Sequence, residues 1–270
     1  MQLAEPPVAS WKAELSLRFG FSEGKSVLAG KKSEGPLVVQ KPLYPEGPEV
    51  CHAIVVHPPG GIAGGDELSL SVRTETEAKA LLTTPGAGKW YRTAGPWAKQ
   101  TLEFDVAGKL EWLPRETIVF DGALAGLGCT VRLGREASFI GWEVVCLGRR
   151  GSGERFDRGE LRSETRVLRE DRLLFFEKSR IDAGGRLMRS AAGLGGRSVF
   201  GTMLATGDFS KTDALRSEKH IAVTQLPGLL VARYLGDSGE EALRGFTRLW
   251  CLLRPAVAGR AAVEPRIWST

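Results

Sequence analysis

Alternation of apolar and polar residues is the dominant pattern along this chain. Residues 12–19 alternate between two faces, one carrying Ala13, Leu15, Leu17 and Phe19 and the other Lys12, Glu14, Ser16 and Arg18. A period of two is that of a β-strand with one buried face. The same alternation recurs in residues 67–73 and 100–106, so the pattern predicts a strand in each of the three segments.

Many further segments have the composition of strands. They are residues 36–40, 50–57, 78–84, 109–113, 116–120, 127–133, 137–147, 160–169, 172–181, 198–206, 220–225 and 229–235. Turn residues separate these segments at short intervals, which leaves no room for repeated βαβ units. The chain is therefore predicted to be mainly β.

Two segments have a helical pattern. Residues 210–219 are short and polar. The second helix begins at Ser238, with Glu241 three residues later in a capping-box arrangement. Its apolar face carries Ala242, Leu243, Phe246, Leu249, Trp250 and Leu253. Pro255 is predicted to end it. Residues 148–159 form the most loop-like stretch, and residues 1–270 are predicted to form a single domain.

Composition narrows the class of protein. The chain of 270 residues carries a net charge of +5, but its basic and acidic residues are interleaved, so no basic block indicates nucleic-acid binding. No apolar run is long enough to span a membrane, and the first residues lack the features of a signal peptide. The four cysteines lie in or beside apolar runs without a C-x-x-C pair. A reduced, cytoplasmic protein with cysteines in its core is expected.

Two segments rich in glycine stand out. In His57-Pro-Pro-Gly-Gly-Ile-Ala-Gly-Gly-Asp66, six of the ten residues are Pro or Gly. Such a segment is a shaped loop, because it suits neither a helix nor a central strand. The second, Thr83-Thr-Pro-Gly-Ala-Gly-Lys-Trp-Tyr-Arg92, contains a turn at residues 84–88. It is not a phosphate-binding loop, since Thr83 replaces the first glycine and Trp90 the hydroxyl residue after Lys89.

Metal ligands are sparse in the sequence. Cys51 and His57 share a strand face but lie about 20 Å apart at about 3.3 Å per residue, and His52 points the other way. His52 and His57 are therefore interpreted as structural or surface residues, with a weak metal contact at His57 as the alternative. A nucleophilic catalytic site is not indicated either, because the chain has no G-x-S-x-G motif.

Two carboxylates are predicted on apolar strand faces. Glu143 shares a face with Phe139, Val145 and Leu147, and Glu177 shares one with Leu173, Phe175 and Ile181. A carboxylate in such a place needs an ionic partner, water or a bound cation. Two interpretations stay open: ion pairs with arginines, or the polar lining of a water-filled passage. Asp66 and Asp121 are neighbours of such a passage or, alternatively, turn-forming residues.

The glycine-rich segments resemble those of the urease accessory protein UreD (UreH) family. The resemblance continues through Leu110-Glu-Trp-Leu-Pro-Arg-Glu-Thr-Ile-Val-Phe-Asp-Gly122 and Phe175-Phe-Glu-Lys-Ser-Arg-Ile-Asp182. It ends with Leu253-Arg-Pro, Gly259-Arg-Ala-Ala and Pro265-Arg-Ile-Trp268. These segments occur in the same order over nearly the whole chain, with small departures at Gly88 and Trp90.

The resemblance implies a non-enzymatic scaffold for nickel incorporation into apo-urease. It implies a helicoidal, β-solenoid-like stack of sheets with two short helices near the C-terminal part. The implied partners are UreF, the GTPase UreG and the urease subunits in a hetero-oligomer, without nucleic acid or membrane. It also implies that no cofactor is tightly bound and that nickel in transit passes through an internal tunnel.

Asp66, Glu143 and Glu177 are the candidate tunnel residues, with His57 as a further metal contact. Two other functions stay open as alternatives. One is a small hydrolase that uses Glu143 and Glu177 as acid and base. The other is a basic nucleic-acid-binding protein, suggested by a pI near 9.1. Because a β-rich chain with many apolar strands can expose adhesive surface, poor solubility without a partner is also expected.

Overall fold

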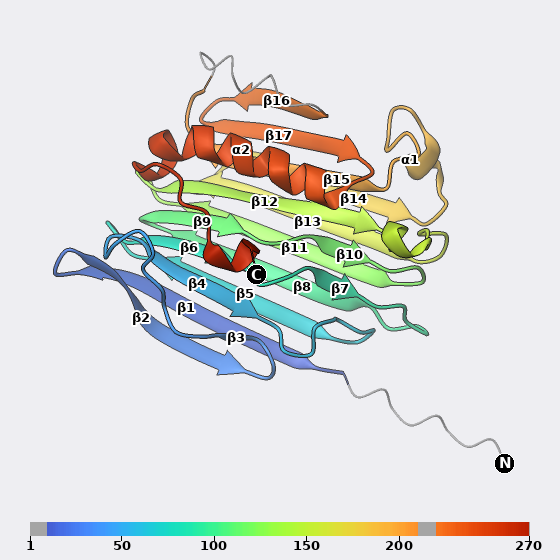
Figure 1. Cartoon of the computed structure of the whole chain (residues 1–270), viewed down its shortest axis with the longest axis horizontal. Coiled ribbons are helices and arrows are strands. Elements are labelled where there is room, and N and C mark those ends of the chain that lie inside the picture. The colour runs from blue at the N-terminus through green and yellow to red at the C-terminus, as the bar shows by residue number, and fades with distance from the viewer. Residues whose placement is uncertain (1–9, 210–219, 270) are drawn as a thin grey trace.

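The computed structural model describes residues 10–209 and 220–269, which form two β-sheets around a shared core. The first sheet contains β1 (Lys12–Ser22), β2 (Lys25–Glu34), β5 (Glu67–Thr74), β8 (Ala98–Val106), β11 (Leu124–Leu133), β13 (Glu160–Arg169) and β14 (Arg172–Asp182). Its strand order is β14-β13-β11-β8-β5-β1-β2, as can be followed in Figure 1.

The second sheet has ten strands. They are β3 (Val38–Val39), β4 (Cys51–Val56), β6 (Lys79–Thr83), β7 (Gly88–Trp90), β9 (Lys109–Leu113), β10 (Thr117–Val119), β12 (Ser138–Leu147), β15 (Val199–Thr206), β16 (Ile221–Leu226) and β17 (Leu229–Gly236). The main order is β16-β17-β15-β12-β9-β6-β4-β3, and β10 adds a short branch between β12 and β7.

The chain coils between the two sheets. Between β4 and β13 it passes repeatedly from one sheet to the other, and each new strand pairs in parallel with the previous long strand of its own sheet. Each turn of the coil therefore adds one long strand to each sheet without a crossover helix. This is the helicoidal, β-solenoid-like stack that was expected, and the mainly β prediction is confirmed.

The predicted alternation places the core. Ala13, Leu15, Leu17 and Phe19 are all buried between the sheets, and their polar neighbours in β1 are exposed. Phe104 of the first sheet packs against Trp112 and Phe139 of the second, with ring centroids 5.7 and 6.1 Å away. The core is thus built from the inward faces of both sheets.

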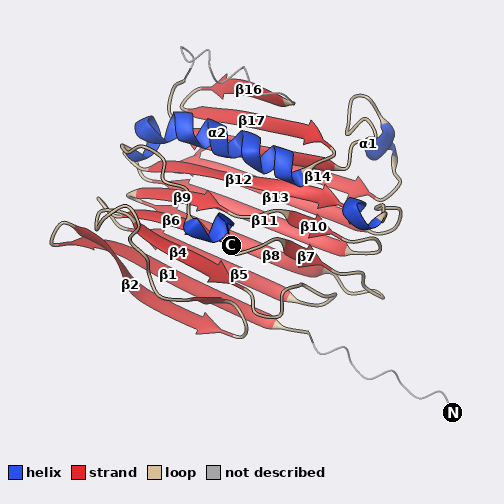
Figure 2. Cartoon of the chain, in the orientation of Figure 1, coloured by secondary structure: helices blue, strands red, loops and turns tan. Residues whose placement is uncertain are grey.

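Helix α2 (Gly239–Ala258) covers the outer face of the ten-stranded sheet, as Figure 2 shows. Phe246, Leu249 and Trp250 pack there in a second apolar cluster with residues of β12 and β15. The Ser238 hydroxyl accepts a hydrogen bond from the backbone N–H of Glu241, as the capping pattern predicted.

The predicted end of this helix is wrong. Pro255 lies inside α2, which continues to Ala258 and ends at Gly259 in the left-handed conformation. A proline removes one intrahelical hydrogen bond and strains the preceding turn, but it does not prevent the helix from continuing. Burial of Leu253 and Val257 against the sheet holds the last turns in place.

Other elements differ from the prediction. Strand β2 was missed because it is a mostly exposed edge strand with a lysine-rich sequence. Strand β7 was missed because its three residues overlap the glycine-rich turn. The predicted helix at residues 210–219 lies outside the described part of the chain, whereas a four-residue helix, α1 (Arg186–Arg189), was not predicted. Two 3-10 turns, η1 (Arg150–Ser152) and η3 (Arg266–Ser269), complete the described elements.

Two expectations about composition can be compared with the structure. Cys51 is buried in the core as expected, but Cys251 is exposed on the outer side of α2, so the interpretation of all four cysteines as core residues is wrong. None of the described helices combines the length and the apolar character that crossing a membrane requires.

Candidate functional site

Two adjoining cavities lie between the sheets. The first has a volume of about 300 Å³, and its walls include the glycine-rich loop and the turn after β6. The second has a volume of about 80 Å³ and extends towards β13, β14 and β15. Four residues line both cavities: Gln100, Leu102, Trp112 and Glu143. The two cavities therefore meet at Glu143 and form a candidate passage through the core.

Glu143 is the carboxylate at this junction. It shares the inward face of β12 with Phe139, Val145 and Leu147, as predicted. Thr117 donates a hydrogen bond to its Oε1 atom, and no salt bridge reaches Glu143 from the described residues. Burial raises the pKa of the Glu143 carboxyl to about 7, although the Thr117 hydrogen bond acts in the opposite direction. The ion-pair interpretation therefore does not apply to Glu143.

Glu177 lines the second cavity but is paired. Arg233 Nη1 lies 2.7 Å from Glu177 Oε1 and also donates to Thr202 Oγ1 at 2.8 Å. Because β14 and β17 belong to different sheets, this ion pair joins the sheets beside the second cavity. The ion-pair interpretation holds for Glu177.

The predicted face of Glu177 is partly wrong. Ile181 is buried, but Leu173 is 54% exposed. The pairing of β13 with β14 shifts in register, so that Val167 lies opposite Phe175 and Leu168 opposite Leu173. This irregularity adds one residue to β14 and turns Leu173 away from the core.

Asp66 is buried and does not line either cavity. Its carboxylate accepts hydrogen bonds from the backbone N–H groups of Trp11 and Ala63, at 2.8 and 2.7 Å. These contacts close the glycine-rich loop and fix it to the start of β1. They support the turn-forming interpretation of Asp66, and its place in a passage stays a prediction.

His57 follows β4 and lines the first cavity. Its Nε2 atom is buried and has no hydrogen-bond partner among the residues that the structure describes. Burial lowers the pKa of the imidazole, although the nearby Asp66 acts in the opposite direction. A neutral imidazole in this position offers a nitrogen lone pair to a metal ion.

The glycine-rich loop owes its composition to close packing. A Cβ atom on Gly61 would lie 2.1 Å from the ring of Tyr91, and one on Gly64 would lie 2.0 Å from Thr93 Oγ1. The backbone of Ile62, between these glycines, exchanges hydrogen bonds with Lys89 and Tyr91. The loop is thus pressed against β7 and the residues after it, where it forms one wall of the first cavity.

Sequence reasoning missed Cys129 as a cavity residue. It lines the second cavity, and burial together with the charge of Glu143 raises the pKa of its thiol to about 12. The signal was present in the alternation of Leu127, Cys129 and Val131, which places all three on the inward face of β11. No group of three or more His, Cys, Asp or Glu side chains in residues 10–209 and 220–269 is arranged to hold a metal ion.

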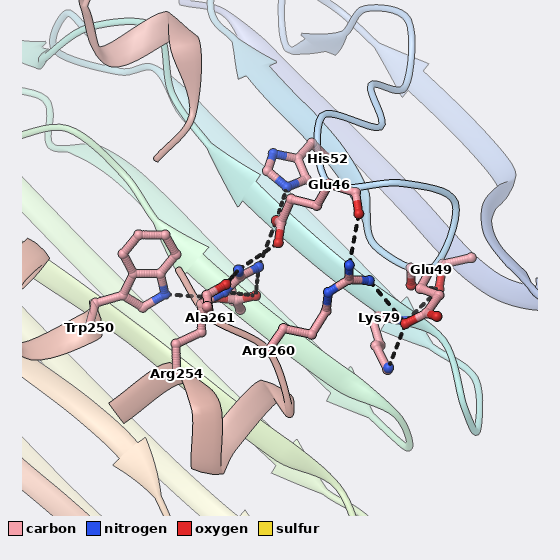
Figure 3. Close-up of polar contacts among 10 residues, drawn as sticks. Glu46, Glu49, His52, Lys79, Trp250, Arg254, Arg260 and Ala261 are labelled. Carbon is pink, nitrogen blue, oxygen red and sulfur yellow. Dashed lines mark hydrogen bonds and ion pairs between the residues drawn. The ribbon is translucent and has the colours of Figure 1, made fainter. Parts of the chain in front are cut away.

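A separate buried network lies beneath α2, on the other side of the ten-stranded sheet (Figure 3). Arg254 is completely buried and forms ion pairs with Glu46 and Glu111 at 2.6 and 2.9 Å. Trp250 donates to Glu111, and His52 Nε2 lies 2.6 Å from Glu46 Oε1. The structural interpretation of His52 agrees with these contacts, and its side chain points away from the face of Cys51, as predicted.

The charges of this network are fully paired. Burial alone would raise the pKa of Glu46, but hydrogen bonds from His52 and Arg254 and the charge of Arg254 lower it to about 2. The same ion pairs raise the pKa of the Arg254 guanidinium against the effect of burial. Arg260, near the end of the chain, donates to the Glu46 carbonyl and pairs with Glu49. The network therefore fixes α2 and the C-terminal segment to the sheet.

Comparison with known proteins identifies the family. Residues 12–269 match the model of the UreD urease accessory protein family. The chain is 46% identical to a urease accessory protein UreD of Methylobacillus flagellatus, in an alignment that covers 96% of this chain and 95% of the relative. It is 48% identical to those of Azoarcus sp. and Pseudomonas aeruginosa, with coverage of 96% and 97% of this chain and 94% and 96% of the relatives. The chain therefore belongs to the UreD family of urease accessory proteins.

Proposed function

We propose that this protein is a non-catalytic scaffold for nickel incorporation into apo-urease, and that nickel passes between its sheets. Membership of the UreD family supports a role in urease maturation. The observation that carries the passage is the meeting of two internal cavities at Glu143, a carboxylate without an ionic partner in the described part of the chain. Nickel is the cargo in this proposal, and no cofactor is tightly bound.

The ligands along the cavities suit a metal ion in transit. His57 offers a nitrogen in the first cavity and Glu143 an oxygen at the junction, whereas the Cys129 thiol in the second cavity stays protonated at neutral pH and offers only a weak sulfur contact. Nitrogen and sulfur ligands suit late first-row metals, and oxygen binds them less tightly. Ligands that contact the ion in succession allow it to exchange from one to the next. Glu177 is the weakest candidate, because Arg233 already neutralises it.

The proposed partners are those of the family. We expect UreF to bind this chain and to recruit the GTPase UreG, which supplies nickel and the nucleotide chemistry. The assembly then docks on the urease subunits as a cytoplasmic hetero-oligomer.

The proposal is tested in cells that carry the urease operon with and without this gene. Deletion is expected to remove urease activity and urease-bound nickel while the urease subunits stay at normal levels. Glu143→Ala is expected to lower the nickel content of urease. The control is Glu103→Ala, which changes an exposed side chain of β8 and should leave the nickel content unchanged. Unchanged nickel after deletion would refute the role in maturation. Loss after deletion but not in Glu143→Ala would refute the passage alone.

A hydrolase is the second candidate, and one observation favours it. A carboxyl with a pKa of about 7 suits a general acid. Against this function, the second cavity of about 80 Å³ has little room for a substrate, and its other carboxylate is paired with Arg233. Turnover of a small substrate by the isolated chain, abolished in Glu177→Gln, would support the hydrolase over the scaffold.

A further inference from the structure

A surface hollow lined by arginines lies apart from the passage. Its volume is about 570 Å³, and it is lined by Tyr91, Arg92, Phe120, Asp121, Arg149, Glu154 and Arg158. These residues come from the segments after β7 and β10 and from the loop at residues 148–159. None of them lines either cavity between the sheets.

The hollow has a fixed framework. The Asp121 carboxylate accepts two hydrogen bonds from the Arg158 guanidinium and two from the backbone N–H groups of Asp157 and Arg158. Glu154 accepts hydrogen bonds from Arg149 and from the backbone of Asp121. The side chain of Phe156, in the same loop, is buried. The loop is therefore tied to the body of the protein at several points.

Positive charge is in excess around this hollow. Two arginines of its wall are paired, but Arg92 is exposed and forms no hydrogen bond or ion pair with any described residue. Arg150 and Arg155 in the neighbouring loop are likewise exposed and unpaired within the described chain. By contrast, on the outer face of the seven-stranded sheet Arg18, Arg132, Arg162 and Arg166 each have an acidic partner.

An aromatic wall completes the hollow. Tyr91 is 38% exposed and packs edge-on against Phe120, with ring centroids 5.1 Å apart. The Arg149 guanidinium lies 4.5 Å from the centroid of the Phe120 ring. Tyrosine and arginine are among the residues that contribute most to the affinity of protein interfaces.

We propose that this arginine hollow binds an acidic segment of a partner protein. The donors for its carboxylates are Arg92 and the Nη1 atoms of Arg149 and Arg158. None of these groups makes a hydrogen bond with a described residue, because Arg149 and Arg158 use their Nε and Nη2 atoms to hold Glu154 and Asp121. Tyr91 supplies the surface against which the segment packs. A nucleic acid fits less well, because it needs an extended basic stripe, and here two carboxylates interrupt the arginines.

Fluorescence anisotropy of a labelled (Glu-Gly)4 peptide with the full chain tests this proposal. Arg92→Gln is expected to weaken binding about tenfold, the effect of losing one charged hydrogen bond. Arg150→Gln, in the loop beside the hollow, should weaken binding less than Arg92→Gln, because Arg150 does not line the hollow. Arg132→Gln is the matched control, because it makes the same change of charge on the outer face of the sheet and should leave the affinity unchanged. A (Lys-Gly)4 peptide should not bind.

Several outcomes would overturn the proposal. Equal affinity of the unmodified chain and the Arg92→Gln variant would place the peptide elsewhere. An equal loss in Arg132→Gln would show attraction by net charge alone. Inorganic phosphate competing as well as the peptide would indicate a simple anion site. Tighter binding of single-stranded DNA, lost in Arg92→Gln, would indicate a nucleic-acid site. Nickel is absent from the assay, so its result is independent of the proposed passage.

Discussion

Glu46 and Glu143 are two carboxylates inside the same protein with opposite surroundings. Glu46 receives hydrogen bonds from Arg254 and His52, and its pKa is lowered to about 2. From the described residues Glu143 receives one hydrogen bond, donated by Thr117, and burial raises its pKa to about 7. The paired carboxylate fixes a helix to a sheet, whereas Glu143 lines a cavity. Incomplete pairing at a cavity is therefore what distinguishes a candidate site from a structural network.

The largest expected effect comes from breaking the paired region. Arg254→Met leaves Glu46 and Glu111 buried without their cation, which should lower the free energy of unfolding by about 3–5 kcal/mol. Urea denaturation measures this loss. Arg244→Met, which removes an exposed pair with Glu240, should change stability by less than about 0.5 kcal/mol. Similar effects in the two variants would contradict the structural role of the network.

The next effect is a loss of stability in acid. Because the pKa of Glu46 is lowered in the folded state, its contribution is complete above the ordinary value of 4.5 and is lost as the pH falls towards about 2. The loss amounts to about 3 kcal/mol, from about 1.4 kcal/mol per pH unit. Denaturation of the unmodified chain and Glu46→Gln between pH 5 and pH 2 measures it. An equally steep loss in the variant would assign the acid sensitivity to other groups.

Glu143 should show the opposite sign. Its folded pKa is raised, so its contribution is complete below 4.5 and is lost as the pH rises to about 7. Glu143→Gln keeps the neutral form and should therefore gain stability over the unmodified chain as the pH rises above 4.5, by about 3 kcal/mol at pH 8. Thermal unfolding at pH 5 and pH 8 tests this, with Glu103→Gln as an exposed control. A difference that does not vary with pH would show that Glu143 is hydrated or paired in solution.

The smallest effect concerns the single hydrogen bond to Glu143. Thr117→Val removes the donor, which should raise the pKa of Glu143 further and cost about 1 kcal/mol. The pH dependence measured for Glu143 should therefore extend to higher pH in this variant. An unchanged pH profile would mean that Thr117 does not donate to the ionised carboxylate.

The strands and their faces could be predicted because they depend on local pattern. Alternation placed Leu15 and Phe19 in the core and Glu143 on the inward face of β12. It failed at Leu173, where one extra residue in β14 reverses the face. The end of α2 was missed because the tertiary burial of Val257 outweighs the local effect of Pro255.

The sequence by itself determined the family, the mainly β class and, in the regular strands that it predicted, the side of the sheet on which residues such as Leu15 and Glu143 lie. Family segments and periodicity are local features, so they can be read without contacts. Only the tertiary structure decided which carboxylates are paired. Arg254 lies 208 residues from Glu46, and Arg233 lies 56 residues from Glu177. Partners at such distances are chosen by the coiling of the chain between two sheets, and the same coiling leaves Glu143 facing a cavity.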